Sequence, residues 1–152
     1  MTIRSGPSDA QVRGTCLLPG DAEGDLLWLD EPISFWGGID PATGNIVDVH
    51  HPQLGACIRD RVIALPGTRG STAGPGALLE AILAGNGPRA IILTMPDTAC
   101  VVAILASQPL LASGLPVLAI DSAVACRLRV KPRWHVSGAS AWPVTQDAPV
   151  DQ

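Results

Sequence analysis

The sequence predicts an α/β domain, and three observations support this prediction. The chain has 152 residues, which is the usual size of a single domain. Its 16 glycines and 14 prolines separate short apolar runs, a pattern typical of short elements joined by tight turns. From Arg61 onward, strand-like apolar runs alternate with helix-like stretches, which favours a parallel sheet with right-handed crossovers.

The first half of the chain is expected to form a small antiparallel sheet. Its apolar runs are short and are divided by turn-forming Pro, Gly, Asp and Asn residues. The expected strands are residues 13–18, 26–29, 33–36 and 46–49.

The second half is expected to supply the parallel sheet and its helices. The expected strands are residues 61–66, 90–94 and 116–120, with one more strand within 127–136. The expected helices are residues 74–84 and about 98–107. The polar stretches 1–11 and 145–152 are expected to be flexible tails, which leaves residues 12–144 as the domain.

Charge and hydropathy exclude two classes of partner. The net charge is −4 and the ten basic residues are scattered, so nucleic-acid binding is not expected. The longest apolar run, residues 99–106, is far shorter than the roughly 20 residues that span a bilayer, so a soluble, cytoplasmic protein is expected. Only 16% of residues are charged, against about 25% in typical domains, which suggests that a partner subunit covers part of the surface.

The clearest local motif is the glycine-rich segment 65–76, between an expected strand and an expected helix. Its glycines let the backbone approach a ligand, and the free N–H groups at a helix start attract anions. Ser71 or Thr72 is a candidate helix cap, and Pro75 suits the first turn. The segment lacks the lysine of a P-loop, which removes the main support for kinase-like chemistry. Local pattern alone leaves both an anion site and a plain capped turn with a solvated Arg69 open.

A second segment, residues 35–55, brings ionisable groups to an expected strand end. Asp48, His50 and His51 suit either a metal site or a hydrogen-bonded turn, and two histidines with one acid make the metal site the weaker hypothesis. His135 has no partner nearby in sequence and is expected to be a surface or packing residue. The tryptophans are expected in the core or at an interface: Trp28, Trp36, Trp134 and Trp142. The cysteines are expected to be ordinary, mostly buried thiols: Cys16, Cys57, Cys100 and Cys126.

Segments 33–52 and 62–71 together resemble the small, swivel-domain subunit of the aconitase X family. The resemblance extends from about Gly14 to Ser122, and two long motifs in the same order make it more specific than a glycine-rich turn. It implies a swivelling β/β/α domain, as in the aconitase swivel domain. It also implies a hydro-lyase whose large subunit holds an iron–sulfur cluster, over which the swivel domain closes. The four cysteines do not match a cluster-binding set, so this chain is expected to bind no metal or cluster by itself.

The resemblance also assigns residues to the reaction. The catalytic serine of the family falls on Ser71, which would remove a proton from carbon while the iron of the cluster takes the hydroxyl group. The residues implied around it are Arg69, Gly70 and Thr72 for binding the small anionic substrate, with Asp48 and His51 behind them.

Elementary energetics indicate that such a serine needs a shared site. Its hydroxyl is about as weak an acid as bulk water, so forming the alkoxide near neutral pH costs on the order of 11 kcal/mol. A helix N-terminus supplies at most about 2 kcal/mol. The remainder would come from Arg69, desolvation and the assembly of substrate and metal, so the isolated subunit is expected to be inactive.

Two substrates and two other classes of function remain open. Bacterial members of the family dehydrate cis-3-hydroxy-L-proline to a pyrroline-2-carboxylate, and archaeal members dehydrate mevalonate 5-phosphate. One lysine and three glutamates are unlike the composition of hyperthermophiles, which favours hydroxyproline. The alternatives are a phosphohistidine carrier using His50 or His51, and a non-catalytic module in which Ser71 only caps a helix.

Overall fold

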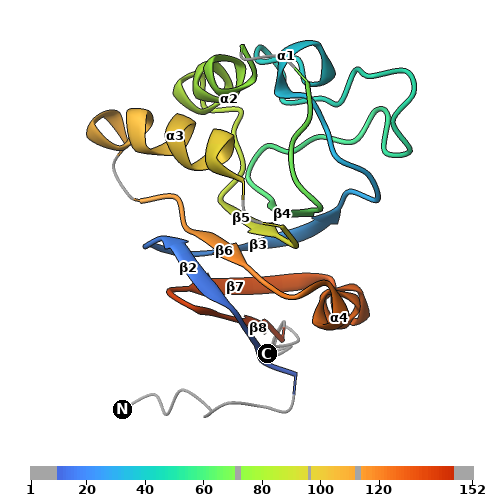
Figure 1. Ribbon diagram of the computed structural model, residues 1–152, viewed down its shortest axis with the longest axis vertical. Helices are drawn as coiled ribbons and strands as arrows, with labels where there is room; N and C mark the ends of the chain where they lie inside the picture. The colour runs from blue at the N-terminus through green and yellow to red at the C-terminus, as the bar shows by residue number, and fades with distance from the viewer. Residues whose placement is uncertain (1–9, 71–72, 96, 112–113, 146–152) are drawn as a thin grey trace, which may run out of the picture.

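Four parallel strands form the centre of a mixed sheet in the computed structural model, which describes residues 10–70, 73–95, 97–111 and 114–145 (Figure 1). Within these residues the sheet has the strand order β1-β8-β7-β3-β4-β5-β6-β2. Strands β3 to β6 run parallel, whereas β7 pairs with β3, β8 with β7, β1 with β8, and β2 with β6 in antiparallel fashion. The strands are β1 (Val12–Arg13), β2 (Thr15–Leu18), β3 (Asp21–Trp28), β4 (Val62–Leu65), β5 (Ala90–Leu93), β6 (Val117–Ala119), β7 (Arg133–Ser137) and β8 (Ser140–Pro143).

Helices cover both sides of the central strands. Figure 1 shows α1, α2 and α3 on one side of β4 and β5, and α4 on the other side, near β7. The helices are α1 (Phe35–Gly38), α2 (Gly74–Leu83), α3 (Thr98–Ser107) and α4 (Ser122–Ala125), with 3₁₀ turns η1 (Gln108–Leu110) and η2 (Cys126–Val130). No helix in the described part of the chain is long and apolar enough to cross a membrane.

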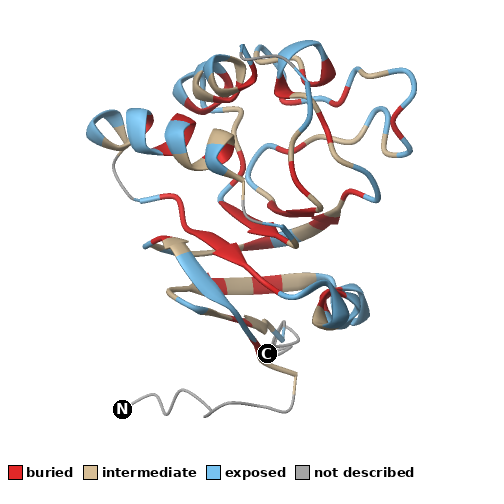
Figure 2. Ribbon diagram, in the orientation of Figure 1, coloured by how far each residue is buried: buried red, intermediate tan, exposed pale blue. Residues whose placement is uncertain are grey.

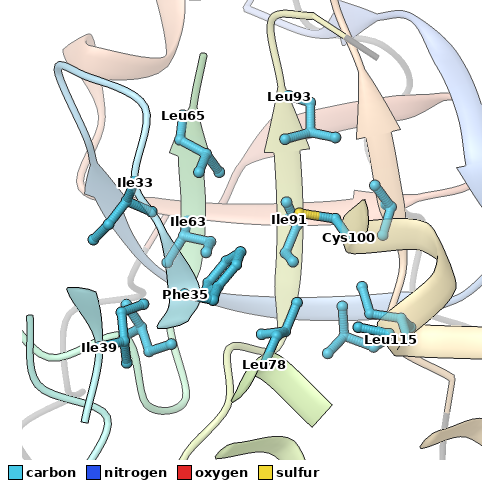
Figure 3. Close-up of a cluster of buried hydrophobic side chains, with 14 of the residues drawn as sticks. Ile33, Phe35, Ile39, Ile63, Leu65, Leu78, Ile91, Leu93, Cys100 and Leu115 are labelled. Atoms are coloured by element: carbon cyan, nitrogen blue, oxygen red, sulfur yellow. The ribbon is translucent and has the colours of Figure 1, made fainter. Parts of the chain in front are cut away.

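Strands β4 and β5 are buried on both faces because each face packs against its own apolar cluster (Figure 2). Alternate side chains on a strand point to opposite faces. The cluster under α1, α2 and α3, shown in Figure 3, takes Ile63, Leu65, Ile91 and Leu93. The cluster on the opposite face, which includes the fully buried Trp134, takes Val62, Ala64, Ala90 and Ile92. The uninterrupted apolar runs of the sequence therefore follow from burial on two sides.

Gly14 connects β1 and β2, the strands at the two edges of the sheet. Only this residue separates β1 from β2, although they lie at opposite ends of the sheet, so the sheet must curl round on itself. The Gly14 N–H donates to the carbonyl of Ala139 at 2.8 Å. A Cβ atom at this position would lie 2.0 Å from the carbonyl oxygen of Ala119, so no larger residue fits without movement of the backbone.

The prediction for the second half is confirmed. Strands β4, β5 and β6 and helices α2 and α3 lie within or coincide with the predicted ranges, and the three strands are parallel. The predicted strand within residues 127–136 is partly wrong, because Cys126–Val130 form a 3₁₀ turn and β7 begins at Arg133. Strand β8 was not predicted.

The prediction of a separate antiparallel sheet in the first half is wrong. Strands β1, β2 and β3 each pair with strands from later in the chain. The expected strand 13–18 is interrupted at Gly14, and the expected strand 26–29 is mostly the end of the longer β3. Residues 33–36 and 46–49 are not strands: they contain isolated bridges at Ile33 and Ile46 and the start of α1.

The physical reason lies in how this region buries its apolar side chains. Ile33, Phe35, Ile39 and Ile46 all belong to the cluster under the helices, so a loop with regularly spaced apolar anchors imitates the alternation of a strand. Gly37, with a φ of +79°, turns the chain between these anchors.

Candidate active site

The candidate site lies at the carboxyl ends of β4 and β5. The loop 66–70 follows β4, and Asp97 lies at the start of α3 after β5. In α/β sheets, ligands bind outside the carboxyl ends of the parallel strands. A cleft of about 260 Å³ opens at this edge. Its lining residues are Phe35, Thr68, Arg69, Gly70, Gly74, Pro75, Asp97 and Ala99.

The loop after β4 is fixed on one side by the segment that precedes α1. Ile33 forms a parallel bridge with Thr68, and the Arg69 N–H donates to the Ile33 carbonyl at 3.1 Å. Gly70 has a φ of +95°, and a Cβ atom there would lie only 3.1 Å from Ser34 Oγ. The two sequence segments that carry the family resemblance therefore meet side by side at this cleft.

Arg69 lies at the wall of the cleft with a carboxylate beside it. Its guanidinium Nη2 is 3.5 Å from Asp48 Oδ2, and the Arg69 side chain is half exposed. A hydrogen bond from the backbone N–H of His50, supported by the charge of Arg69, holds the pKa of the Asp48 carboxyl below its usual value. Because a guanidinium has five N–H donors, Arg69 can pair with Asp48 and still donate to an anionic ligand.

Asp97 connects α3 with the loop after β4. Its Oδ2 accepts hydrogen bonds from the Thr68 backbone N–H at 2.6 Å and from the Thr68 hydroxyl at 2.5 Å, while Oδ1 accepts from the Ala99 N–H at 2.9 Å. Partial burial acts to raise the pKa of the Asp97 carboxyl, but the hydrogen bonds led by Thr68 outweigh it and lower the pKa. Sequence reasoning missed Asp97, although an acidic residue directly before an apolar helix, after a neighbouring parallel strand, was an available signal.

His51 is buried in a turn behind Asp48. Its Nδ1 accepts a hydrogen bond from the Gln53 N–H, and its Nε2 donates to the Glu31 carbonyl, both at 3.1 Å. The backbone N–H of His51 also donates to the Asp48 carbonyl at 3.1 Å. Because both ring nitrogens have protein partners, His51 is poorly suited to binding a metal or accepting a phosphoryl group. The neighbouring His50 is exposed to solvent. Among the described residues, no three His, Cys, Asp or Glu side chains are placed to hold a metal ion.

Ser71 and Thr72 lie outside the described residues, so the structure gives no geometry for either. Helix α2 has Ala73 at its N-cap position and Pro75 in its first turn. The expectation for Pro75 is confirmed. The predicted capping by Ser71 or Thr72 falls on residues that the structure does not describe, and Ala73 occupies the N-cap position.

The remaining histidine and the tryptophans have varied surroundings. His135 stacks on Trp142 with ring centroids 4.6 Å apart, and its Nε2 lies 2.8 Å from Asp21 Oδ1. Trp134 is fully buried, whereas Trp36 is 61% exposed next to the cleft residue Phe35. Trp28 is half-buried under the guanidinium of Arg129.

The family model for the aconitase X swivel domain matches residues 11–139. This chain belongs to the aconitase X swivel domain family. The swivelling β/β/α fold expected from the resemblance is also confirmed by a solved structure of Thermococcus kodakaraensis aconitase X, which covers 92% of this chain with a TM-score of 0.75 and 23% identity, and is itself covered completely.

Relatives of the swivel domain fall into two groups by length and by name. A cis-3-hydroxy-L-proline dehydratase of Pseudomonas aeruginosa is 41% identical over 101 residues, which are 66% of this chain. The chain spans only 17% and 19% of the length of the two hydroxyproline dehydratases that it matches. A phosphomevalonate dehydratase small subunit of Pyrococcus furiosus is 34% identical over 119 residues, covering 78% of this chain and 88% of the relative. The relatives thus share a dehydratase name but differ in substrate.

Proposed function

We propose that this chain is the small, swivel-domain subunit of an aconitase X-type dehydratase, active only with a large subunit. The observation that carries this proposal is the meeting of the two resemblance segments at one cleft, with Arg69 fixed at its wall by the contacts with Ile33 and Asp48. A relative named as a phosphomevalonate dehydratase small subunit, of which this chain matches 88%, supports the proposal.

Each candidate residue has a distinct task in this proposal. Arg69 binds the carboxylate of the substrate, and Gly70 lets the backbone come close to it. Ser71, which follows Gly70 in the sequence, removes the proton from carbon, and Thr72 contributes to binding. Asp48 keeps the Arg69 side chain oriented, and His51 supports the turn that carries Asp48.

An iron–sulfur cluster does not fit the donor set of this chain. No three His, Cys, Asp or Glu side chains in the part of the chain that the structure describes could hold a metal ion, and burial raises the pKa of the Cys100 thiol to about 12. The expectation of mostly buried cysteines is wrong, because only Cys100 of the four is buried. A buried thiol of this kind stays protonated at neutral pH, whereas cluster ligands are thiolates. We therefore assign the cluster to the large subunit.

The proposed substrate is cis-3-hydroxy-L-proline. The identity of 41% to one hydroxyproline dehydratase supports it, although the other hydroxyproline dehydratase is 34% identical and phosphomevalonate dehydratase small subunits reach 39%. Mevalonate 5-phosphate is the alternative, because the relatives whose own length this chain largely covers are phosphomevalonate dehydratase small subunits. Both molecules are anionic, so Arg69 is compatible with either.

The surface beside the cleft suits a partner subunit. Large apolar side chains are exposed there on one irregular segment: Trp36 at 61%, Val47 at 45%, Val49 at 73% and Leu54 at 51%. The hydrogen bond from the Val47 N–H to the Gly38 carbonyl brings the stretch around Asp48 next to α1. We name these four residues the apolar rim. Exposed aromatic and aliphatic groups around a site mark a protein interface, and we assign the rim to the large subunit.

The decisive experiment is to co-express this chain with a large aconitase X-type subunit, purify the complex anaerobically, and assay both substrates in parallel. We expect dehydration of cis-3-hydroxy-L-proline by the complex and none by this chain alone. Turnover of mevalonate 5-phosphate instead would make that compound the assigned substrate. A stable complex that is inactive on both compounds would contradict both substrate assignments. Failure to form any complex would favour a stand-alone module.

Two variants test the residue roles in the same assay. Ser71→Ala is expected to lower kcat by several orders of magnitude while the complex still forms, because the base is gone and the fold loses little. Arg69→Ala is expected to raise KM as well as lower kcat, because a charge-assisted contact to the substrate is lost. Full activity of Ser71→Ala would favour a non-catalytic module, and an unchanged KM in Arg69→Ala would remove its role in substrate binding.

A further inference from the structure

Thr68 is fixed from two sides, by two elements that are distant in the sequence. On one side it pairs with Ile33 in a parallel bridge. On the other side its backbone N–H and its hydroxyl both donate to Asp97, 29 residues later in the chain. The flanking glycines, Gly67 with a φ of +148° and Gly70 with a φ of +95°, would otherwise give this loop wide conformational freedom.

The carboxylate of Asp97 has little remaining capacity to bind a substrate. It accepts hydrogen bonds from the Thr68 N–H, the Thr68 hydroxyl and the Ala99 N–H. A carboxylate has two oxygens with about four lone-pair sites, so these three donors occupy most of them. Although Asp97 lines the cleft, its hydrogen bonds are directed into the protein.

Asp97 also does more than cap its helix. Asp121 occupies the same N-cap position in α4, where its Oδ1 accepts from the Ala123 N–H at 2.8 Å. Asp97 makes the equivalent bond to Ala99 with Oδ1, but its Oδ2 is bonded to the loop after the neighbouring strand. Capping uses one oxygen, so the second oxygen is available to connect two elements.

We infer that Asp97 and Thr68 form a positioning pair, in which the Asp97 carboxylate fixes Thr68 and thereby sets the direction of Arg69, the next residue in the chain. This inference rests on the proposed function for its effect on turnover, but not for its effect on the loop. Residues 68 and 69 then approach a substrate in one conformation, which lowers the entropy cost of binding and of reaching the transition state.

The first test measures the loop directly, without any assay of activity. Amide hydrogen exchange of this chain, followed by NMR at Thr68 and Arg69, is compared in the natural protein, Asp97→Asn and Asp121→Asn. We expect exchange at Thr68 to become at least about tenfold faster in Asp97→Asn, because the amide nitrogen of asparagine cannot accept the bonds that a second carboxylate oxygen accepts. Asp121→Asn is the matched control and should leave it unchanged. Unchanged exchange at Thr68 in Asp97→Asn would overturn the inference whether or not the proposed function holds.

The second test uses the complex with the large subunit. Asp97→Asn and Thr68→Val are expected to lower kcat/KM about ten- to a hundredfold through misplacement of Arg69, with KM raised as in Arg69→Ala. Thr68→Ser keeps the hydroxyl and is expected to restore near-natural values, and Asp121→Asn to leave them unchanged. If Thr68→Val and Asp97→Asn lose thermal stability like Asp121→Asn but keep kcat and KM, the pair is structural only and the inference fails. An unmodified complex without dehydratase activity would instead count against the proposed function. It would not affect the positioning pair, because the hydrogen-exchange measurement needs no activity.

Discussion

The segments on either side of β4 bury apolar side chains in different ways. Residues 29–61, between β3 and β4, contain one short helical turn and are otherwise held by turns and the isolated bridges at Ile33, Ile39 and Asn45. The described residues from 62 to 119 alternate strands with two ten-residue helices. Both segments contribute to the same apolar cluster, and both expose large apolar side chains. Those of the first segment, the apolar rim, lie around Asp48 and α1, whereas those of the second lie mainly on the outer sides of the helices: Leu83, Met95, Val102, Leu105 and Leu110.

This difference separates two physical tasks. The regular segment satisfies its backbone hydrogen bonds locally and supplies a rigid platform. The backbone of the irregular segment mostly forms turns, and Asp48 and the apolar rim lie at the surface of the protein. We therefore expect substitutions in the regular segment to change stability and those in the irregular segment to change association, and the following variants test that division.

The largest effect on stability is expected at the centre of the regular segment. Ile91 is fully buried in β5 and belongs to the cluster under the helices. Ile91→Ala should lower the free energy of unfolding by about 2–5 kcal/mol, because it removes apolar contacts and leaves a cavity. Urea denaturation measures this loss. The kcat of the folded complex should stay unchanged, and a loss below about 1 kcal/mol would contradict the role assigned to this strand.

An intermediate effect is expected on association. Trp36→Ala should weaken binding to the large subunit at least about tenfold, since an exposed tryptophan at an interface is a typical hot spot. Its thermal stability should barely change, because the side chain is 61% exposed in the free chain. Titration calorimetry with the large subunit measures the affinity. Leu110→Ala is the control: Leu110 is 71% exposed but lies beyond the other end of α3 from Asp97, and equal weakening by both variants would argue against the apolar rim.

The smallest effect is expected in acid. The hydrogen bond from His50, with help from Arg69, lowers the pKa of Asp48 in the folded chain below its unfolded value. Its contribution to stability is therefore present above the unfolded pKa and is lost as the pH falls through the folded pKa. Asp48→Asn should lose less stability between neutral and acidic pH than the natural chain does, measured by urea denaturation at each pH. An identical acid dependence would show that Asp48 contributes nothing detectable there.

The sequence predicted those parts of the fold whose signal is local. Helix α3 coincides with the predicted range because the apolar stretch begins directly after Asp97, whose side chain caps it. The pairing of β1 with β8, of β2 with β6 and of β3 with β7 depends on residues about a hundred or more positions apart, and apolar periodicity contains no information on such pairs.

The candidate site shows the same limit. The glycine-rich loop and Arg69 stood out by composition, and Ser71 followed only from the family resemblance. Asp97 and its bonds to Thr68 arise because β4 and β5 are parallel neighbours, which places the residues after both strands at one edge. The partners of His135, Asp21 and Trp142, likewise lie on neighbouring strands, and the sequence pattern did not predict that these strands pair.

The junction at Gly14 also limits how this chain can associate with other chains. Because β1 and β2 continue one another across this residue while pairing with opposite ends of the sheet, the described strands leave only short lengths of unpaired backbone at the margin. Exposed margins of this kind are where a foreign strand adds during domain swapping or fibril growth. We therefore expect a partner to recognise this chain mainly through side chains and loops. The continuous path from β1 to β2 depends on Gly14, where no side chain larger than a hydrogen atom fits.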